Sequence, residues 1–188
     1  MSDKSYLSVY AKSFSWAGFF LPRETLKKCS VLYDFCRVAD NIADDNDEIE
    51  VKEKKFAEFE NEFNQKKFDN LIIKNMWGIM EEFNISIRIV QDLLAGIKSD
   101  IKERVELNSK KDLLIYSYRV AGTVGLMMAK ILNVTKKNSL KSAIDLGIAM
   151  QLTNISRDVL EDSKNNRFYI EENFEKISST VNLANRFY

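Results

Sequence analysis

The sequence contains no histidine, which excludes catalytic triads and general bases built on histidine, and most zinc sites. It contains two cysteines, Cys29 and Cys36, on one predicted helix and therefore about 10 Å apart along its axis. That separation is too large for a disulfide, and a reduced intracellular protein is expected. Carboxylates, amides, hydroxyls and cations remain for any chemistry.

Net charge is also lacking, because 28 Lys and Arg residues balance 28 Asp and Glu residues, so we expect no nucleic-acid partner. One proline and six glycines among 188 residues are too few for the turns of a sheet protein and predict an all-α fold. The chain starts without the charged and apolar pattern of a secretory leader, and its longest weakly polar run, residues 120–132, is too short to span a bilayer. We therefore expect a cytoplasmic protein, with peripheral membrane association as an alternative.

The chain shows no repeat, linker or low-complexity tract, which predicts a single domain over residues 1–188. Hydrophobic periodicity predicts helices at residues 4–14, 22–45, 48–67, 69–83, 85–107, 110–132 and 136–163, with another starting near residue 170. In the third of these, Phe56, Phe59 and Phe63 recur at helical spacing among charged residues. This spacing predicts a surface helix with one buried stripe.

A polar line runs along the otherwise apolar segment from Ala143 to Asp162. One apolar stripe along this segment consists of Ile144, Ile148, Leu152, Ile155 and Val159. Three further apolar residues widen it, namely Leu146, Met150 and Leu160, so the pattern predicts a helix that is buried nearly all round. The polar line, at i, i+3, i+7 and i+11, consists of Gln151, Asn154, Asp158 and Asp162. Such a line either faces water or meets something cationic, since unpaired buried carboxylates are costly.

A second helix repeats the pattern, with Tyr33, Arg37, Asp40 and Asp44 on one face. Asp40 and Asp44 lie one turn apart, so both carboxylates can reach one cluster of cations. Oxygen ligands without cysteine or histidine favour Mg²⁺, with Mn²⁺ as an alternative. We expect the two acidic pairs to face one cavity from roughly antiparallel helices and to hold metal ions that bridge to phosphate oxygens.

The predicted helix over residues 110–132 carries small residues at i, i+4 and i+8, namely Ala121, Gly125 and Ala129. Two interpretations remain open. The small residues allow close helix packing, or they leave room for a long apolar ligand with Tyr116 and Tyr118 at its mouth.

These motifs resemble the squalene/phytoene synthase family of head-to-head prenyl transferases. The resemblance covers essentially the whole chain and rests on the segments KSFS (12–15) with LP (21–22), LYDFCRVADNIADD (32–45), Gly96 with Asp100, YSYRVAGTVG (116–125), QLTNISRDVLED (151–162) and RFY (167–169). The 32–45 and 151–162 segments are highly specific to the family. This sequence departs from the family at Asn41, where many members carry aspartate, and at Tyr10, where several carry histidine.

The resemblance implies an isoprenoid-synthase-type helical bundle around a central cavity, here without the last helices of the family. It implies metal binding by Asp40, Asp44, Asn154, Asp158 and Asp162, and diphosphate binding by Lys12, Ser13, Arg37 and Arg157. Tyr33, Arg37, Tyr116 and Gln151 would take part in catalysis. The implied reaction joins two farnesyl or geranylgeranyl diphosphates through a cyclopropylcarbinyl diphosphate to a triterpene or tetraterpene skeleton.

Three alternatives stay open at this point: a non-catalytic assembly factor, an inactive truncated fragment, and a terpene cyclase that uses one prenyl diphosphate. A chain without the last helices would leave apolar cavity wall facing water. We therefore expect a poor catalyst that is open on one side of its cavity and prone to self-association.

Overall fold

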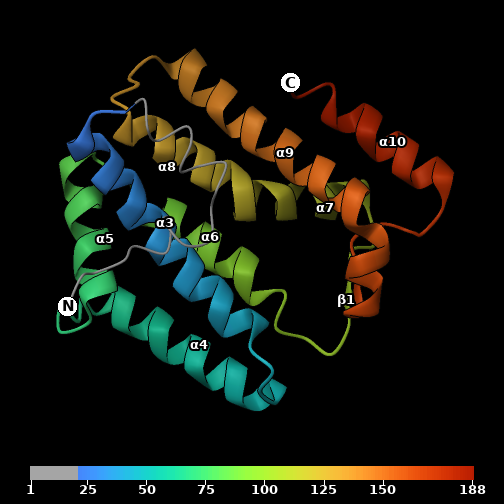
Figure 1. Cartoon of the computed structure of the whole chain (residues 1–188), viewed down its shortest axis with the longest axis horizontal. Helices are drawn as coiled ribbons and strands as arrows, with labels where there is room; N and C mark the ends of the chain where they lie inside the picture. The colour runs from blue at the N-terminus through green and yellow to red at the C-terminus, as the bar shows by residue number, and fades with distance from the viewer. Residues whose placement is uncertain (1–20) are drawn as a thin grey trace.

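The computed structural model of the chain describes residues 21–188, which are mostly helical, and confirms the all-α prediction (Figure 1). The predicted helix at residues 4–14, together with Tyr10, Lys12 and Ser13, lies outside the described residues. Within the described residues, no helix is both long enough and apolar enough to cross a bilayer.

The first four described helices are α3 (Arg23–Asp44), α4 (Ile49–Asn64), α5 (Leu71–Glu82) and α6 (Ile87–Lys98). Pro22 precedes α3, where its missing N–H costs nothing. Asn70 caps α5 by accepting a hydrogen bond from the Ile72 N–H. Each of these helices begins and ends within a few residues of its predicted bounds, except α6.

The second half contains α7 (Lys110–Ser117), the π-helical turn η1 (Tyr118–Gly122), α8 (Thr123–Ile131), α9 (Lys137–Lys164) and α10 (Phe174–Ala184). Ser109 and Asn173 cap α7 and α10 through their side chains. The predicted helix over residues 110–132 is thus interrupted by a π turn, and the predicted start near 170 lies at Phe174. A π turn inside a helix often marks a functional site.

Aromatic side chains hold the first half together. Phe35 of α3 lies 5.4 Å from Phe59 and 5.5 Å from Phe63 between ring centroids, and Trp77 of α5 stacks on Phe63. Phe56, Phe59 and Phe63 are all buried, which confirms the predicted stripe on α4. A second core forms where α7, α9 and α10 meet, around Leu152 and Ile155.

The predicted helix over residues 85–107 is wrong beyond Lys98. There the Ser99 hydroxyl donates to the Gly96 carbonyl, which provides a local alternative to continued helix, and the chain turns away. It then forms the short strand β1 (Val105–Glu106), which pairs in parallel with β2 (Arg167–Phe168). The apolar periodicity continues through this segment because Ile101 and Val105, four residues apart, stay buried even though the backbone between them is not helical.

Two expectations for α9 are also wrong. Leu146, Met150 and Leu160 are 49%, 48% and 69% exposed, so the helix is not buried nearly all round. In Figure 1, α3 and α9 both run from upper left to lower right, so these helices are not antiparallel. They bring their C-terminal ends, and with them both acidic pairs, toward the same end of the molecule.

Candidate active site

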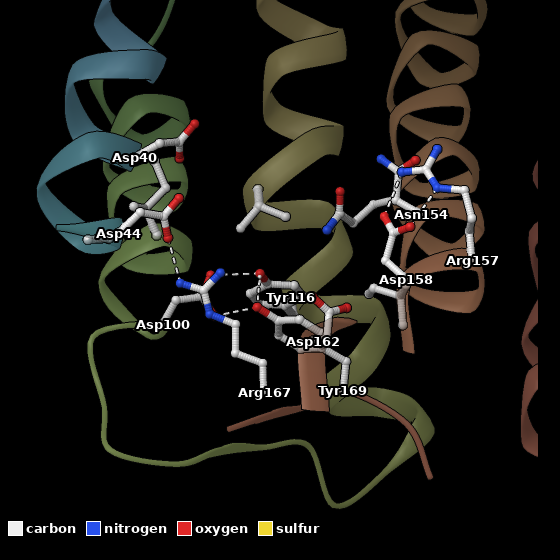
Figure 2. Close-up of a pocket in the computed structure, with 15 residues that line it drawn as sticks. Asp40, Asp44, Asp100, Tyr116, Asn154, Arg157, Asp158, Asp162, Arg167 and Tyr169 are labelled. Carbon is white, nitrogen blue, oxygen red and sulfur yellow. Dashed lines mark hydrogen bonds and ion pairs between the residues drawn. The ribbon is translucent and has the colours of Figure 1, made fainter. Parts of the chain in front are cut away.

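A pocket of about 310 Å³ lies between the C-terminal ends of α3, α6 and α9 and the junction of α7 with η1. Eight of the twelve predicted site residues line it: Asp40, Asp44, Tyr116, Gln151, Asn154, Arg157, Asp158 and Asp162. Figure 2 shows Asp40 and Asp44 on one side, facing Asn154 and Asp158 across the space. The prediction that both acidic pairs point into one cavity is confirmed.

The other four predicted site residues stand elsewhere. Tyr33 and Arg37 are half-buried on α3, on the face of Asp40 and one to two turns before it, and do not line this pocket. Arg37 nevertheless acts on the pocket through its charge, which opposes part of the rise in the pKa of Asp40 that burial and Asp44 cause. Lys12 and Ser13 lie outside the described residues.

The carboxylates of the pocket lie where their negative charge is energetically unfavourable unless a cation binds. Asp44 is the last residue of α3, and Asp162 lies in the last turn of α9, where the helix dipole is negative. Burial and the charge of Asp44 raise the pKa of Asp40 to about 6. Burial and the charge of Asp158 also raise the pKa of Asp162. A bound cation would relieve both the repulsion and the desolvation.

Two arginines already compensate part of this negative charge. Arg167 of β2 donates to Asp44 over 2.5 Å, which joins residues far apart in the sequence. Arg157 donates to both oxygens of Asp158, at 2.7 and 2.5 Å, and lowers the pKa of that carboxyl. Arg167 has no role in the sequence-based assignment, although it belongs to one of the matched segments.

A cluster of two phenols and a carboxylate forms the floor of the pocket. The Tyr116 and Tyr169 rings stack at 4.8 Å, and their hydroxyls, 3.0 Å apart, donate to Asp100 over 2.7 and 3.0 Å respectively. Burial raises the pKa of both phenols and raises the pKa of Asp100 to about 6, although the phenol hydrogen bonds oppose the latter shift. Sequence reasoning assigned no role to Asp100 or Tyr169, and only their place in the matched segments drew attention to them.

An apolar groove of about 560 Å³ continues from the pocket between α8 and α9. Val120, Gln151 and Asn154 line both the polar pocket and the groove, so the two spaces adjoin. The small residues Ala121, Gly125 and Ala129 line the groove, while Gly125 also packs directly against the backbone of Ala143. The close-packing interpretation is therefore confirmed at Gly125. Room for an apolar ligand lies beside these residues, with Tyr116 lining the adjoining pocket, but Tyr118 lines neither space, and occupation by such a ligand stays a prediction.

The donor set of the pocket fits a hard divalent cation, because it consists of carboxylate and amide oxygens. Among residues 21–188, no three carboxylates converge closely enough to form a ready-made metal cage. This arrangement suits Mg²⁺, which keeps several waters and binds through one or two carboxylates together with phosphate oxygens of a substrate. The facing carboxylates on α3 and α9 would each supply such a partial set.

We expect the metal-free protein to be more stable at pH 5 than at pH 7.5. Asp40 and Asp100 have folded-state pKa values of about 6, above the unfolded value of 3.8. At pH 7.5 both are charged in both states; as the pH falls through 6, only the native state takes up protons, so the free energy of unfolding rises. The gain should be about 1 kcal/mol or slightly more for each carboxyl and about 2–3 kcal/mol for the two together, or roughly 4–12 °C in Tm.

Thermal unfolding in EDTA at the two pH values measures this effect. Asp100→Asn should reduce the pH dependence, whereas Asp69→Asn, at an exposed carboxylate on the turn before α5, should leave it unchanged. A Tm that falls between pH 7.5 and pH 5 by the same amount in all three proteins would contradict the assignment.

Comparison with known proteins gives a consistent result. The sequence model of the squalene/phytoene synthase family matches residues 7–174. The chain is 31% identical to a 15-cis-phytoene synthase of Pantoea ananas and 34% identical to one of Enterobacter agglomerans, each over 87% of the chain. It spans only 57% and 59% of these relatives.

Solved structures agree in fold. A dehydrosqualene synthase crystal structure superposes with a TM-score of 0.76 at 27% identity, covering 96% of this chain and 71% of the other. A squalene synthase from Alicyclobacillus acidocaldarius superposes with a TM-score of 0.72 at 18% identity, covering 85% of this chain and 60% of the other. The latter likeness concerns the fold alone.

Proposed function

Because this chain belongs to the squalene/phytoene synthase family, we propose that it takes part in the Mg²⁺-dependent, head-to-head condensation of two prenyl diphosphates. The reaction would pass through a cyclopropylcarbinyl diphosphate to a linear triterpene or tetraterpene skeleton. The observation that carries the proposal is the pocket with opposed carboxylates that opens into an apolar groove. A prenyl diphosphate has the matching form, with an anionic head and a long apolar tail.

The diphosphate head belongs in the acidic pocket. We assign Asp40, Asp44, Asn154, Asp158 and Asp162 to hold the metal ions, which when bound neutralise charge on the departing diphosphate. Arg157, whose side chain is 67% exposed, can leave Asp158 and bind a diphosphate oxygen once a metal occupies that carboxylate. Arg37 on α3 and Arg167 on β2 supply further positive charge near Asp40 and Asp44.

The prenyl tail belongs in the groove between α8 and α9. Departure of diphosphate leaves an allylic cation, which has to be kept from water. Val120 and Ala121 provide apolar wall, and the Tyr116 ring can face positive charge through its π electrons. Asp100 fixes that ring by accepting the hydroxyl hydrogen bond. Gln151, at the boundary of pocket and groove, and Tyr33 on α3 complete the assigned catalytic residues.

The three alternatives are not favoured. An assembly factor has no need of carboxylates converging on one pocket, and the family model that matches is that of the head-to-head synthases rather than of the terpene cyclases. The reaction described next separates an active chain from an inactive fragment. We propose a cytoplasmic location with peripheral membrane contact, because the product is a hydrocarbon.

Incubating the protein with Mg²⁺ and radiolabelled farnesyl or geranylgeranyl diphosphate tests the proposal. We expect slow diphosphate release together with a low yield of coupled C30 or C40 product, in line with the poor catalyst that the sequence predicts, and no reaction in EDTA. Free prenyl alcohol alone would show ionisation without coupling and would contradict the condensation. Absence of diphosphate release with either substrate would contradict the proposal altogether.

A further inference from the structure

Arg167 carries a positive charge that most of the acids in the pocket share. Its guanidinium donates to Asp44 over 2.5 Å, and Figure 2 shows the side chain directed to that carboxylate. Its charge also opposes part of the rise in the pKa of Asp40, Asp100 and Asp162. One arginine therefore serves as counter-ion to four carboxylates from separate parts of the chain.

The guanidinium of Arg167 is enclosed, unlike that of Arg157. The Arg167 side chain is 26% exposed, against 67% for Arg157. Burial disfavours its charged form, but the hydrogen bond and the charge of Asp44 outweigh burial and raise the pKa of Arg167. Its backbone is held as well, since Arg167 pairs with Val105 where β2 meets β1. Arg157 can therefore turn to water when it leaves Asp158, whereas Arg167 has to exchange Asp44 for another acceptor within the pocket.

A metal ion at Asp44 competes with the Arg167 guanidinium for the same carboxylate. The metal has to break the hydrogen bond between the two residues, and the enclosed guanidinium then repels it. A diphosphate opposes both effects, because its oxygens offer the displaced guanidinium a new anionic acceptor. Metal and diphosphate together therefore leave neither Asp44 nor Arg167 unpaired.

We propose that Arg167 occupies Asp44 in the metal-free protein and thereby makes metal binding depend on diphosphate. The metal alone has to displace the guanidinium without compensation, so it binds weakly. Metal and diphosphate then raise each other's affinity, and this coupling is reciprocal. The inference rests on the metal site of the proposed function and adds to it that the carboxylates bind a metal tightly only when the substrate head is present.

Binding of Mn²⁺ to the full chain, followed by electron paramagnetic resonance without any prenyl substrate, tests the inference. Arg167→Gln should bind Mn²⁺ alone about tenfold more tightly than the wild type, because one hydrogen bond between charged groups no longer has to be broken. Inorganic diphosphate should raise the Mn²⁺ affinity of the wild type by roughly tenfold or more and that of Arg167→Gln by less, with the Mn²⁺–diphosphate equilibrium in solution measured separately. Arg167→Lys retains the charge without the planar fork and should lie between the two.

Thermal unfolding provides an independent measurement. In EDTA, Arg167→Gln should have a lower Tm than the wild type, because four carboxylates lose their counter-ion. Mn²⁺ alone should raise the Tm of Arg167→Gln more than that of the wild type, since it binds the variant more tightly. Arg104→Gln is the matched control, because it removes the same charge and an ion pair with Glu106 beside β1 but does not line the pocket. It should bind Mn²⁺ as the wild type does.

Equal Mn²⁺ affinity of the wild type and Arg167→Gln without diphosphate would overturn the inference, as would the same gain in Arg104→Gln. If Arg167→Gln did not fold, a diphosphate effect of full size in Arg167→Lys would overturn it instead. Absence of Mn²⁺ binding under every condition would contradict the metal site and the inference together. Because no prenyl diphosphate is present, a protein that condenses its substrates can still fail these measurements, so the two failures are distinguishable.

Discussion

Asp158→Asn should abolish the Mg²⁺-dependent binding of an unreactive farnesyl diphosphate analogue, with an affinity loss on the order of a hundredfold or more. Asp158 faces Asp40 and Asp44 across the pocket, and its neutral amide would contribute neither charge nor a bidentate ligand. The substitution also releases Arg157, which now donates to both Asp158 oxygens. Residual binding through arginine should therefore persist and be independent of Mg²⁺.

Calorimetric titration with and without EDTA separates these contributions. Glu161→Gln is the matched control, because Glu161 is an exposed acid on the same turns of α9 that does not line the pocket. Glu48→Gln, next to the start of α4, serves as a second control. Equal Mg²⁺-dependent binding by the wild type and Asp158→Asn would contradict the assignment of Asp158 as a metal ligand.

The convergence of the acids could be predicted from the sequence because helical periodicity fixes which residues share a face. Asp40 with Asp44, and Asp158 with Asp162, are each one turn apart on helices whose other faces are apolar. When the apolar faces of such a helix are buried, its acidic face has to be directed to water or to a polar pocket, and one pocket shared by both helices meets this requirement. The relative direction of the two helices carries no such signal, and the antiparallel prediction was wrong.

The rest of the pocket depends on contacts between distant segments, which local patterns do not encode. Arg167 reaches Asp44 only because β2 pairs with β1, and two-residue strands leave no periodicity in the sequence. Asp100 meets Tyr169 for the same reason. Burial, in contrast, was predictable even where secondary structure was not: Ile101 and Val105 are 2% and 4% exposed although the helix ends at Lys98.

Gly147→Ala should lower the free energy of unfolding by about 3 kcal/mol, or roughly 6–12 °C in Tm. The π turn η1 brings the carbonyl oxygen of Ala121 against α9 at Gly147. A Cβ on Gly147 would lie 2.4 Å from that oxygen and 2.9 Å from the Cα of Gly122. Because the obstructing atoms are backbone, they can move only if η1 shifts away from α9.

Gly78→Ala separates this clash from the general effect of removing a glycine. Gly78 lies within α5, and a Cβ there would meet nothing within 4 Å, so alanine should stabilise the protein by about 0.5–1 kcal/mol. In thermal and urea unfolding, the two variants should therefore change the free energy of unfolding with opposite signs.

Since Val120 of η1 lines both the pocket and the groove, Gly147→Ala should also weaken binding of the farnesyl diphosphate analogue, whereas Gly78→Ala should not. If Gly147→Ala were as stable as the wild type, η1 would not lie in close contact with α9 at Gly147. That result would contradict the packing that places Val120 between the pocket and the groove.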